Sequence, residues 1–297
     1  MDEKIKSCLI TGALGDAFGS RFEQMDLPAG EERWEFSDDT QLTIATCEAI
    51  LEAKGPQPEE IARHIVVWYN QGRLSGLGAS TLKALVELRS GQHWSKAGAE
   101  GELSSGNGAA MRIAPLAFLL DPLVEADRIH IRDICCITHR NEEAYLGALA
   151  VVYAIRFVQN DRLNFIQNIV RQLPESELRK RLIEISQAPN MRIRDLGRKF
   201  GSSGQVVESV PLALYAAQQA PEIGIEKMMK EVVAAGGDTD TNCAIAGHIA
   251  GVQLGLDAIP PSWMEKLRNT PNYDDFAAVI REYATYVSTQ SGIKTLF

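Results

Sequence analysis

Apolar residues recur three and four positions apart along most of this 297-residue chain. Ile245, Ile249 and Val252 show the spacing, which lines one face of an α-helix. Alternating runs of β-branched residues, the signal of half-buried strands, are scarce. The pattern therefore predicts an all-α fold. Besides the helix around 245–252, helices are predicted at 42–53, 58–72, 142–159, 174–186, 221–236 and 274–288.

Glycine and alanine are dense in several of these segments. ITGALGDAFGS carries Gly12, Gly15 and Gly19, and EEAYLGALAVVYAI carries alanines on most faces. Helices whose contacts are made by small side chains approach closely, so we expect a compact many-helix globule. No linker or low-complexity tract interrupts the sequence, and a single domain over residues 1–297 is predicted.

The charge balance argues against several classes of partner. The formal net charge is −9, and no block of lysine and arginine occurs. A protein that binds a nucleic-acid backbone normally presents a basic face, so nucleic acid is not an expected partner. No stretch resembles a membrane span or the apolar part of a signal peptide, and no membrane association is expected. Five cysteines without a C-x-x-C pair favour buried thiols in a reducing cytoplasm.

Two clusters of acids and hydroxyls each precede a predicted helix. S-D-D-T occupies 37–40 and D-T-D-T occupies 238–241, about 200 positions further on. One Asp or Thr would cap a helix, and the helix dipole favours acids in a first turn, so capping is one interpretation. Capping does not require two carboxylates at each helix start. The excess makes ligand binding the alternative interpretation.

The carboxylates of the two clusters have the chemistry of a cation site. Asp238 and Asp240 are spaced to converge on one point, whereas Asp38 and Asp39 would reach two neighbouring points. If the fold joined the clusters, four carboxylates would repel one another unless cations lay between them. The candidate ligands are all oxygens, which select Mg²⁺, Mn²⁺ or Ca²⁺ over zinc. Spacing alone leaves open whether the clusters meet.

Two glycine-rich turns are candidates for anion binding. G-L-G at 76–78 leads directly into a helix, and G-N-G at 106–108 precedes an apolar run that contains Arg112. Backbone N–H groups at such turns bind phosphate oxygens without basic side chains, although ordinary turn chemistry is the alternative. His139 fits either a core histidine or a side chain at the edge of a cleft.

Five motifs in this order carry a resemblance to a known family. They are G-x-x-G-D-A-F-G-S-R-F-E (12–23), S-D-D-T-Q-L-T (37–43), G-N-G-A-A-M-R (106–112), T-H (138–139) and G-G-D-T-D-T-N (236–242). Together they resemble the ADP-ribosylglycohydrolase family from about residue 5 to residue 256. The resemblance implies an all-α fold of that type, with two Mg²⁺ or Mn²⁺ ions at the bottom of a cleft.

The resemblance also implies roles for individual residues. The expected metal ligands are Ser37, Asp38, Asp39, Asp238, Asp240 and Thr241. The catalytic candidates are Glu23, Asp38, Asp39, Asp238 and Asp240, among which the sequence does not identify the general base. The expected substrate contacts are Gly76, Gly78, Ala79, Ser80, Gly106, Asn107, Gly108, Met111 and His139. Residues 24–36 correspond to a segment that acts as a flap in the family.

The implied activity is hydrolysis of the glycosidic bond between ADP-ribose and a modified protein side chain or small acceptor. Such an enzyme reverses mono-ADP-ribosylation, and an ADP-ribosylated protein or small adduct is its expected partner. We expect a monomer. Two alternatives stay open: a catalytically silent ADP-ribose binder, and a different dinuclear-metal phosphohydrolase. The linkage that is cut, to arginine, serine or another acceptor, is also open.

Overall fold

The computed structural model describes residues 1–23, 34–101, 104–162, 164–187 and 191–294, which form fourteen α-helices. The α-helices are α1 (Asp2–Gly19), α2 (Asp38–Ala53), α3 (Pro58–Asn70), α4 (Ala79–Arg89), α5 (Glu125–Cys136), α6 (Glu142–Gln159), α7 (Phe165–Gln172), α8 (Glu177–Ser186), α9 (Ile193–Phe200), α10 (Val206–Ile223), α11 (Ile225–Val233), α12 (Thr239–Leu254), α13 (Pro261–Arg268) and α14 (Tyr273–Lys294). The 3₁₀ helices are η1 (Ser20–Phe22), η2 (Trp94–Lys96), η4 (Ala114–Phe118) and η5 (Leu256–Ala258).

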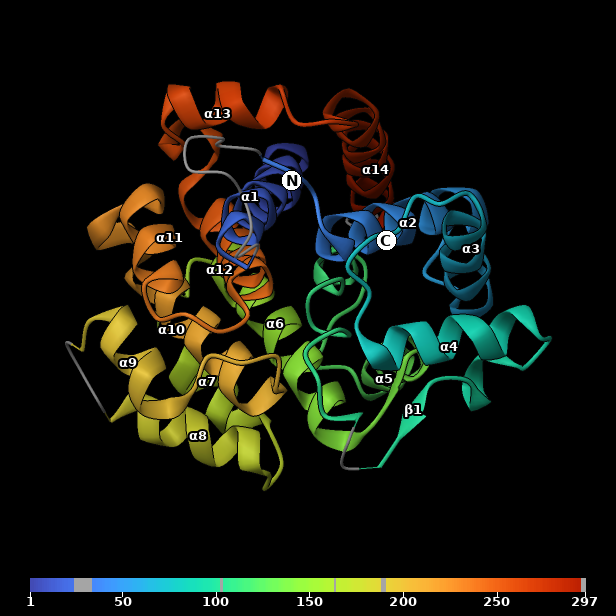
Figure 1. The fold of residues 1–297 in the computed structure, drawn as a ribbon, viewed down its shortest axis with the longest axis horizontal. Helices are drawn as coiled ribbons and strands as arrows, with labels where there is room; N and C mark the ends of the chain where they lie inside the picture. The colour runs from blue at the N-terminus through green and yellow to red at the C-terminus, as the bar shows by residue number, and fades with distance from the viewer. Residues whose placement is uncertain (24–33, 102–103, 163, 188–190, 295–297) are drawn as a thin grey trace.

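The all-α prediction is confirmed (Figure 1). Within the described ranges the regular β-structure is one parallel pair of two-residue strands, β1 (Ala99–Glu100) and β2 (His139–Arg140), with Ala99 opposite His139. This pairing joins the segment after α4 to the segment before α6. The backbone of His139, which lies between α5 and α6, is therefore held by a segment outside those two helices.

Most of the predicted helices are present, and their caps explain their ends. α6 spans the predicted residues, and the Asn141 side chain accepts a hydrogen bond from the Ala144 N–H. The helix predicted from 174 begins at Glu177, because the Ser176 hydroxyl caps it by accepting from the Arg179 N–H. The helix predicted at 42–53 begins earlier, at Asp38, and takes in the acidic cluster.

The prediction that a helix opens at Pro221 is wrong. Pro221 lies inside the last turn of α10, which ends at Ile223. Proline keeps a helical φ but has no N–H to donate to the carbonyl of residue 217, and the helix ends two residues later. The chain turns at Gly224, whose φ of 80° suits glycine, and α11 opens at Ile225.

The helices α1 and α12 pack backbone against backbone near the middle of the molecule (Figure 1). A Cβ atom added to Gly15 would lie 2.2 Å from the carbonyl oxygen of Cys243. One added to Gly251 would lie 2.2 Å from the carbonyl oxygen of Ser7. Only glycine fits at these points, so the small residues of both helices set how closely they approach. Close packing through glycine, as the sequence predicts, is confirmed at this contact.

Several other helices pack around this pair. α14 packs against α1 and α2, and α10 packs against α12 and α6. Four of the five thiols, those of Cys8, Cys47, Cys135 and Cys243, are buried, and all five cysteines are free. In the described parts of the chain, no helix combines the length and apolarity that crossing a membrane requires.

Candidate functional site

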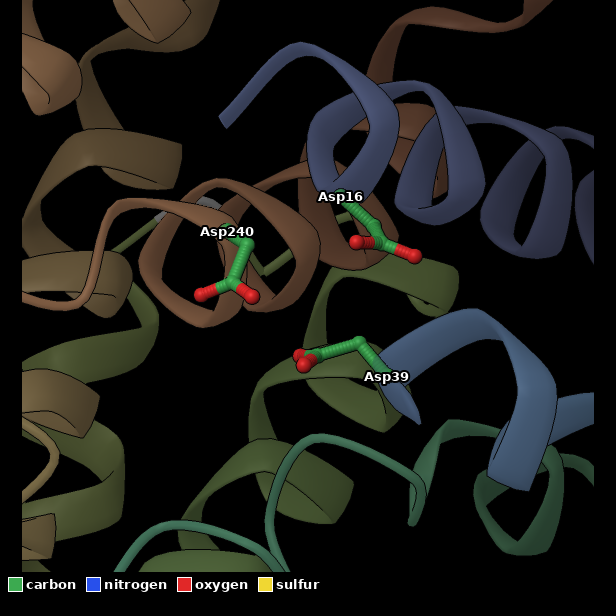
Figure 2. Close-up of side chains that lie close together, drawn as sticks. All are labelled: Asp16, Asp39 and Asp240. Atoms are coloured by element: carbon green, nitrogen blue, oxygen red, sulfur yellow. The ribbon is translucent and has the colours of Figure 1, made fainter. Parts of the chain in front are cut away.

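The two acidic clusters meet beside the C-terminal half of α1. Asp16 of α1, Asp39 of α2 and Asp240 of α12 are all buried, and each offers one oxygen within 4.8 Å of the others. Figure 2 shows the three side chains directed into one space from three different helices. The close packing of α1 on α12 and the contact of α2 with both therefore bring together carboxylates about 200 residues apart in sequence.

A second group of carboxylates lies next to the first. Glu23, Asp238 and Asp240 also offer oxygens within 4.8 Å of one another. Asp240 belongs to both groups, so the two groups are contiguous. The convergence of Asp238 and Asp240, predicted from their spacing, is present in the structure.

Capping at the start of α2 is carried out by Ser37 and Asp16. The Ser37 hydroxyl accepts a hydrogen bond from the Asp39 N–H and donates one of 2.7 Å to Asp16 Oδ1. Asp16 also accepts from the backbone N–H groups of Ser37 and Thr40. Asp16 thus caps α2 from a neighbouring helix, which leaves the carboxylates of Asp38 and Asp39 unnecessary for capping.

The start of α12 shows the same excess of carboxylates. Asp238 occupies the N-cap position, but its side chain makes no capping hydrogen bond. Its Oδ2 accepts a 2.7 Å hydrogen bond from the Asn107 side-chain amide instead. The Thr239 N–H is bound by Glu23 Oε1 at 2.8 Å, so a residue outside the helix caps it.

Burial and mutual repulsion make the ionised carboxylates costly. Burial, followed by the charges of Asp240 and Asp16, raises the pKa of Asp38 to about 8. Burial is also the main reason that the pKa values of Asp238 and Asp240 are raised to about 7. The pKa of Asp39 is raised well above its usual range, by burial and then by the charge of Asp240. A cation among these groups would favour their ionised forms.

The residues fit a divalent cation. Asp39 Oδ1 is fully buried and has no hydrogen-bond partner, although its other oxygen accepts from the Thr241 hydroxyl at 3.2 Å. A buried carboxylate oxygen without a donor is unfavourable unless something positive contacts it. Every side chain in the two groups of three offers oxygen, the ligand atom that Mg²⁺ and Mn²⁺ prefer.

Four carboxylates of the two groups, those of Glu23, Asp39, Asp238 and Asp240, line a cavity of about 280 Å³, and this acidic part of the lining is called the carboxylate floor. The cavity brings together all the sequence-predicted site residues except Ser37, which lies behind Asp39 as a cap. Asp38 lines the cavity but belongs to neither group of three carboxylates. The lining residues are Glu23, Asp38, Asp39, Gly76, Gly78, Ala79, Ser80, Thr81, Gly106, Asn107, Gly108, Met111, His139, Gly204, Asp238, Asp240 and Thr241.

Sequence reasoning missed three residues at the site. Thr81 and Gly204 line the cavity, and Asp16 belongs to the buried carboxylate group. The available signal for Asp16 was its position as the single acid within the small and apolar stretch GALGDAFG. Residues 24–33, which include most of the predicted flap, lie outside the described residues.

The glycine-rich turns line the same cavity beside the carboxylates, and this part of the lining is called the wall. Gly78 is the N-cap of α4 and has no side chain to satisfy the first-turn N–H groups. The 106–108 turn is held by a hydrogen bond from the Asn107 N–H to the Gly204 carbonyl oxygen. His139 is 4% exposed and lines the same cavity, which places it at a cleft wall rather than in the apolar core.

Comparisons of the chain with known proteins found similar sequences and a similar fold. The sequence model of a family described as ADP-ribosylglycohydrolase matches residues 1–291. The chain is 24% identical to ADP-ribosylhydrolase ARH3 of Danio rerio, over 93% of this chain and 90% of that protein. It is 23% identical to ADP-ribosylhydrolase ARH3 of Homo sapiens, over 92% of each. A solved structure described as an ADP-ribosylglycohydrolase-related protein complex superposes with a TM-score of 0.71 at 23% identity, covering 96% of this chain and 98% of that one, and so shares the fold.

Proposed function

Because the chain belongs to the ADP-ribosylglycohydrolase family, we propose that it hydrolyses the glycosidic bond joining ADP-ribose to a modified protein side chain or small acceptor. The observation that carries the proposal is the meeting of two acidic helix starts on the floor of one cavity. Those carboxylates exceed what capping uses, and one of their buried oxygens lacks a donor. The substrate carries phosphates and the site itself is acidic. Cations are therefore needed to offset the repulsion between them.

The proposed cofactor is a pair of Mg²⁺ or Mn²⁺ ions. Asp16, Asp39 and Asp240 would hold one ion, and Asp238 with the shared Asp240 would hold the other, next to Glu23. Ser37, Asp38 and Thr241, at the margins of the two groups, complete the proposed ligand set. When bound, such cations supply Lewis-acid polarisation of the oxygens that they contact.

The cavity walls suit the pyrophosphate of ADP-ribose. The open N-terminus of α4, from Gly78 to Ser80, presents first-turn N–H groups with no capping side chain. Such an N-terminus favours an anion through both its free donors and the helix dipole. The substrate would then lie with its phosphates on the wall and its distal ribose on the carboxylate floor. Gly76, Gly106, Gly108, Asn107 and Met111 complete this proposed wall.

Glu23 is the residue to which we assign proton transfer. Its carboxylate is less buried than those of Asp39 and Asp240 and is fixed by the Thr239 N–H. Partial burial is the main cause that raises its pKa, and the negative charge of Asp238 raises it further. A carboxylate with a raised pKa at the edge of the site accepts a proton from attacking water more readily and can return it to the leaving group.

The test is a panel of defined mono-ADP-ribosylated peptides, linked through arginine or serine, incubated with the protein in Mg²⁺ or in EDTA. We expect free ADP-ribose and the unmodified peptide, identified by mass spectrometry, in Mg²⁺ only. Release of AMP would indicate a phosphohydrolase instead. Binding of ADP-ribose without release from any substrate would indicate a silent binder. The linkage released fastest identifies the acceptor.

A further inference from the structure

The two ring nitrogens of His139 have different surroundings. Nδ1 lies 2.9 Å from the Thr138 hydroxyl oxygen. Nε2 has no hydrogen-bond partner among the described residues and faces the 106–108 turn, where a Cβ added to Gly108 would lie 3.1 Å from it. Since His139 and this turn line the cavity, Nε2 is the nitrogen available to a ligand.

The Thr138 hydroxyl oxygen also contacts the guanidinium group of Arg112. It is fully buried and lies 3.0 Å from Arg112 Nη2, which also donates to the Ile134 carbonyl oxygen. Arg112 is 1% exposed and forms no ion pair with any carboxylate in the described part of the chain. A guanidinium group can only donate hydrogen bonds, so the Thr138 oxygen must accept from it.

Among the described residues, the one acceptor within hydrogen-bond distance of the Thr138 hydroxyl proton is then His139 Nδ1. If Nδ1 carried a hydrogen instead, the Thr138 oxygen would accept twice and its own buried proton would have no partner. Buried donors without acceptors are rare because each forfeits its hydration. The arrangement in which Arg112 donates to Thr138 and Thr138 donates to His139 satisfies the Thr138 hydroxyl and His139 Nδ1, whereas Arg112 Nε and Nη1 have no hydrogen-bond partner among the described residues.

We propose that Arg112 and Thr138 fix His139 as the tautomer with its hydrogen on Nε2, so that His139 is a hydrogen-bond donor to a substrate oxygen. This inference rests on the proposed function, because it takes the acceptor to be a pyrophosphate oxygen of ADP-ribose. The nearby 106–108 turn belongs to the wall assigned to the phosphates, and the Asn107 side chain of this turn donates to Asp238 Oδ2, so this wall adjoins the carboxylate floor. Arg112 and Thr138 are positioning residues in this scheme.

His139 is held in its neutral form, which makes the choice of tautomer consequential. Burial, and then the charge of Arg112, lowers the pKa of His139 to about 3. A neutral imidazole carries one hydrogen, so a donor on Nε2 requires an acceptor at Nδ1. Because this pKa lies far below 7, His139 keeps one protonation state near neutral pH. It is therefore a hydrogen-bond donor rather than a catalytic acid.

The tautomer can be measured in the wild-type protein without substrate or metal. Protein with ¹⁵N-labelled histidine would be studied by two-dimensional NMR, and the His139 signals would be assigned as those missing in the His139→Gln variant. We expect the correlation pattern of a neutral ring protonated at Nε2. A ring protonated at Nδ1, or a charged ring at pH 7, would overturn the proposal whatever the enzyme activity.

The contribution to binding is tested with a matched pair of variants. Thr138→Val removes the hydroxyl with little change of shape, whereas Thr138→Ser retains it. Calorimetric titration with ADP-ribose at saturating Mg²⁺ should show affinity about tenfold weaker in Thr138→Val, because the hydrogen bond to a charged oxygen is no longer enforced. Thr138→Ser should restore most of that affinity, and the Nε2 signature of His139 should weaken in the valine variant only.

Equal affinity in wild type and a folded Thr138→Val, checked by its melting curve, would overturn the donor role. Wild-type protein that binds no ADP-ribose would instead overturn the proposed function and with it the pyrophosphate as acceptor. The NMR pattern separates the two failures, because it is recorded without ligand.

Discussion

Replacing Gly19 by alanine should push α12 away from α1 at the end that carries the acidic residues. Gly19 has an ordinary helical φ of −69°, so the backbone accepts alanine. The added Cβ would lie 2.3 Å from the Thr239 carbonyl oxygen and 2.7 Å from Asp240 Cα. Ordinary contact begins near 3.4 Å, and the start of α12 must therefore retreat by about 1 Å.

The size of the effect follows from this displacement. Overpacking of this kind costs about 1–3 kcal/mol of the free energy of unfolding. For a chain of 297 residues, an unfolding entropy of about 2.1 cal/mol/K per residue converts that cost into a melting temperature lower by about 2–5 °C. The same shift moves Asp240 relative to Asp16, and a misplacement of about 1 Å in a catalytic site can reduce turnover about 100-fold.

Calorimetry and ADP-ribose release, each with and without Mg²⁺, would measure both effects. Gly55→Ala is the matched control, since its Cβ would meet nothing closer than the Gln57 side-chain nitrogen at 3.6 Å. We expect the control to melt and turn over like wild type. If Gly19→Ala matched the control in melting temperature, Mg²⁺ response and turnover, the close approach of α1 and α12 would not determine the geometry of the site.

Four further outcomes are expected. Asp238→Ala should reduce hydrolysis by orders of magnitude and weaken Mg²⁺ binding while circular dichroism stays helical; near-wild-type activity would contradict a ligand role. Mg²⁺ at about 100 times its dissociation constant should raise the melting temperature over EDTA by about 4 °C for each ion bound, and coincident melting curves would argue against shared cation sites. Gly78→Val should weaken ADP-ribose binding in calorimetry without altering the melting temperature, because a Cβ there meets no atom within 4 Å; unchanged affinity would move the phosphates to another wall. Burial lowers the pKa of His248 from 6.5 to about 4, so its stabilising contribution is complete above pH 6.5 and is lost as pH falls toward 4; melting temperatures of His248→Gln should therefore decline less steeply over this range, and equal slopes would exclude His248 as a source of acid sensitivity.

Helices were predictable from the sequence wherever periodicity and caps agreed. α6 has a continuous apolar pattern and an Asn141 cap, and its predicted and observed ends coincide. The boundary between α10 and α11 was not predictable from Pro221, because proline is favoured in the first turn of a helix, whereas Pro221 lies in the last turn of α10. Gly224 was the decisive residue, and its left-handed backbone is visible only in the structure.

The candidate site was partly predictable for a different reason. The excess of acids at 37–40 and 238–241 is a local signal, and it identified residues that line the cavity. Asp16 carries no comparable local signal, since it is a single acid in a glycine-rich helix. Its place beside Asp39 and Asp240 depends on how α1 packs on α12, which no local pattern encodes. The roles of all these residues stay predictions that the experiments above test.

Because the site needs both α1 and α12, it forms only after both helices have been synthesised. During synthesis the ribosome releases Asp16 and Asp39 roughly 200 residues before Asp240, which corresponds to about 10–40 s at ordinary elongation rates. Throughout that interval the growing chain lacks α12, so the face of α1 that carries Gly15 and Gly19 has no α12 to pack against. Contacts of such long sequence separation form late and slow the folding of a chain. The newborn polypeptide therefore carries no assembled acidic floor until its final helices emerge and close over the first.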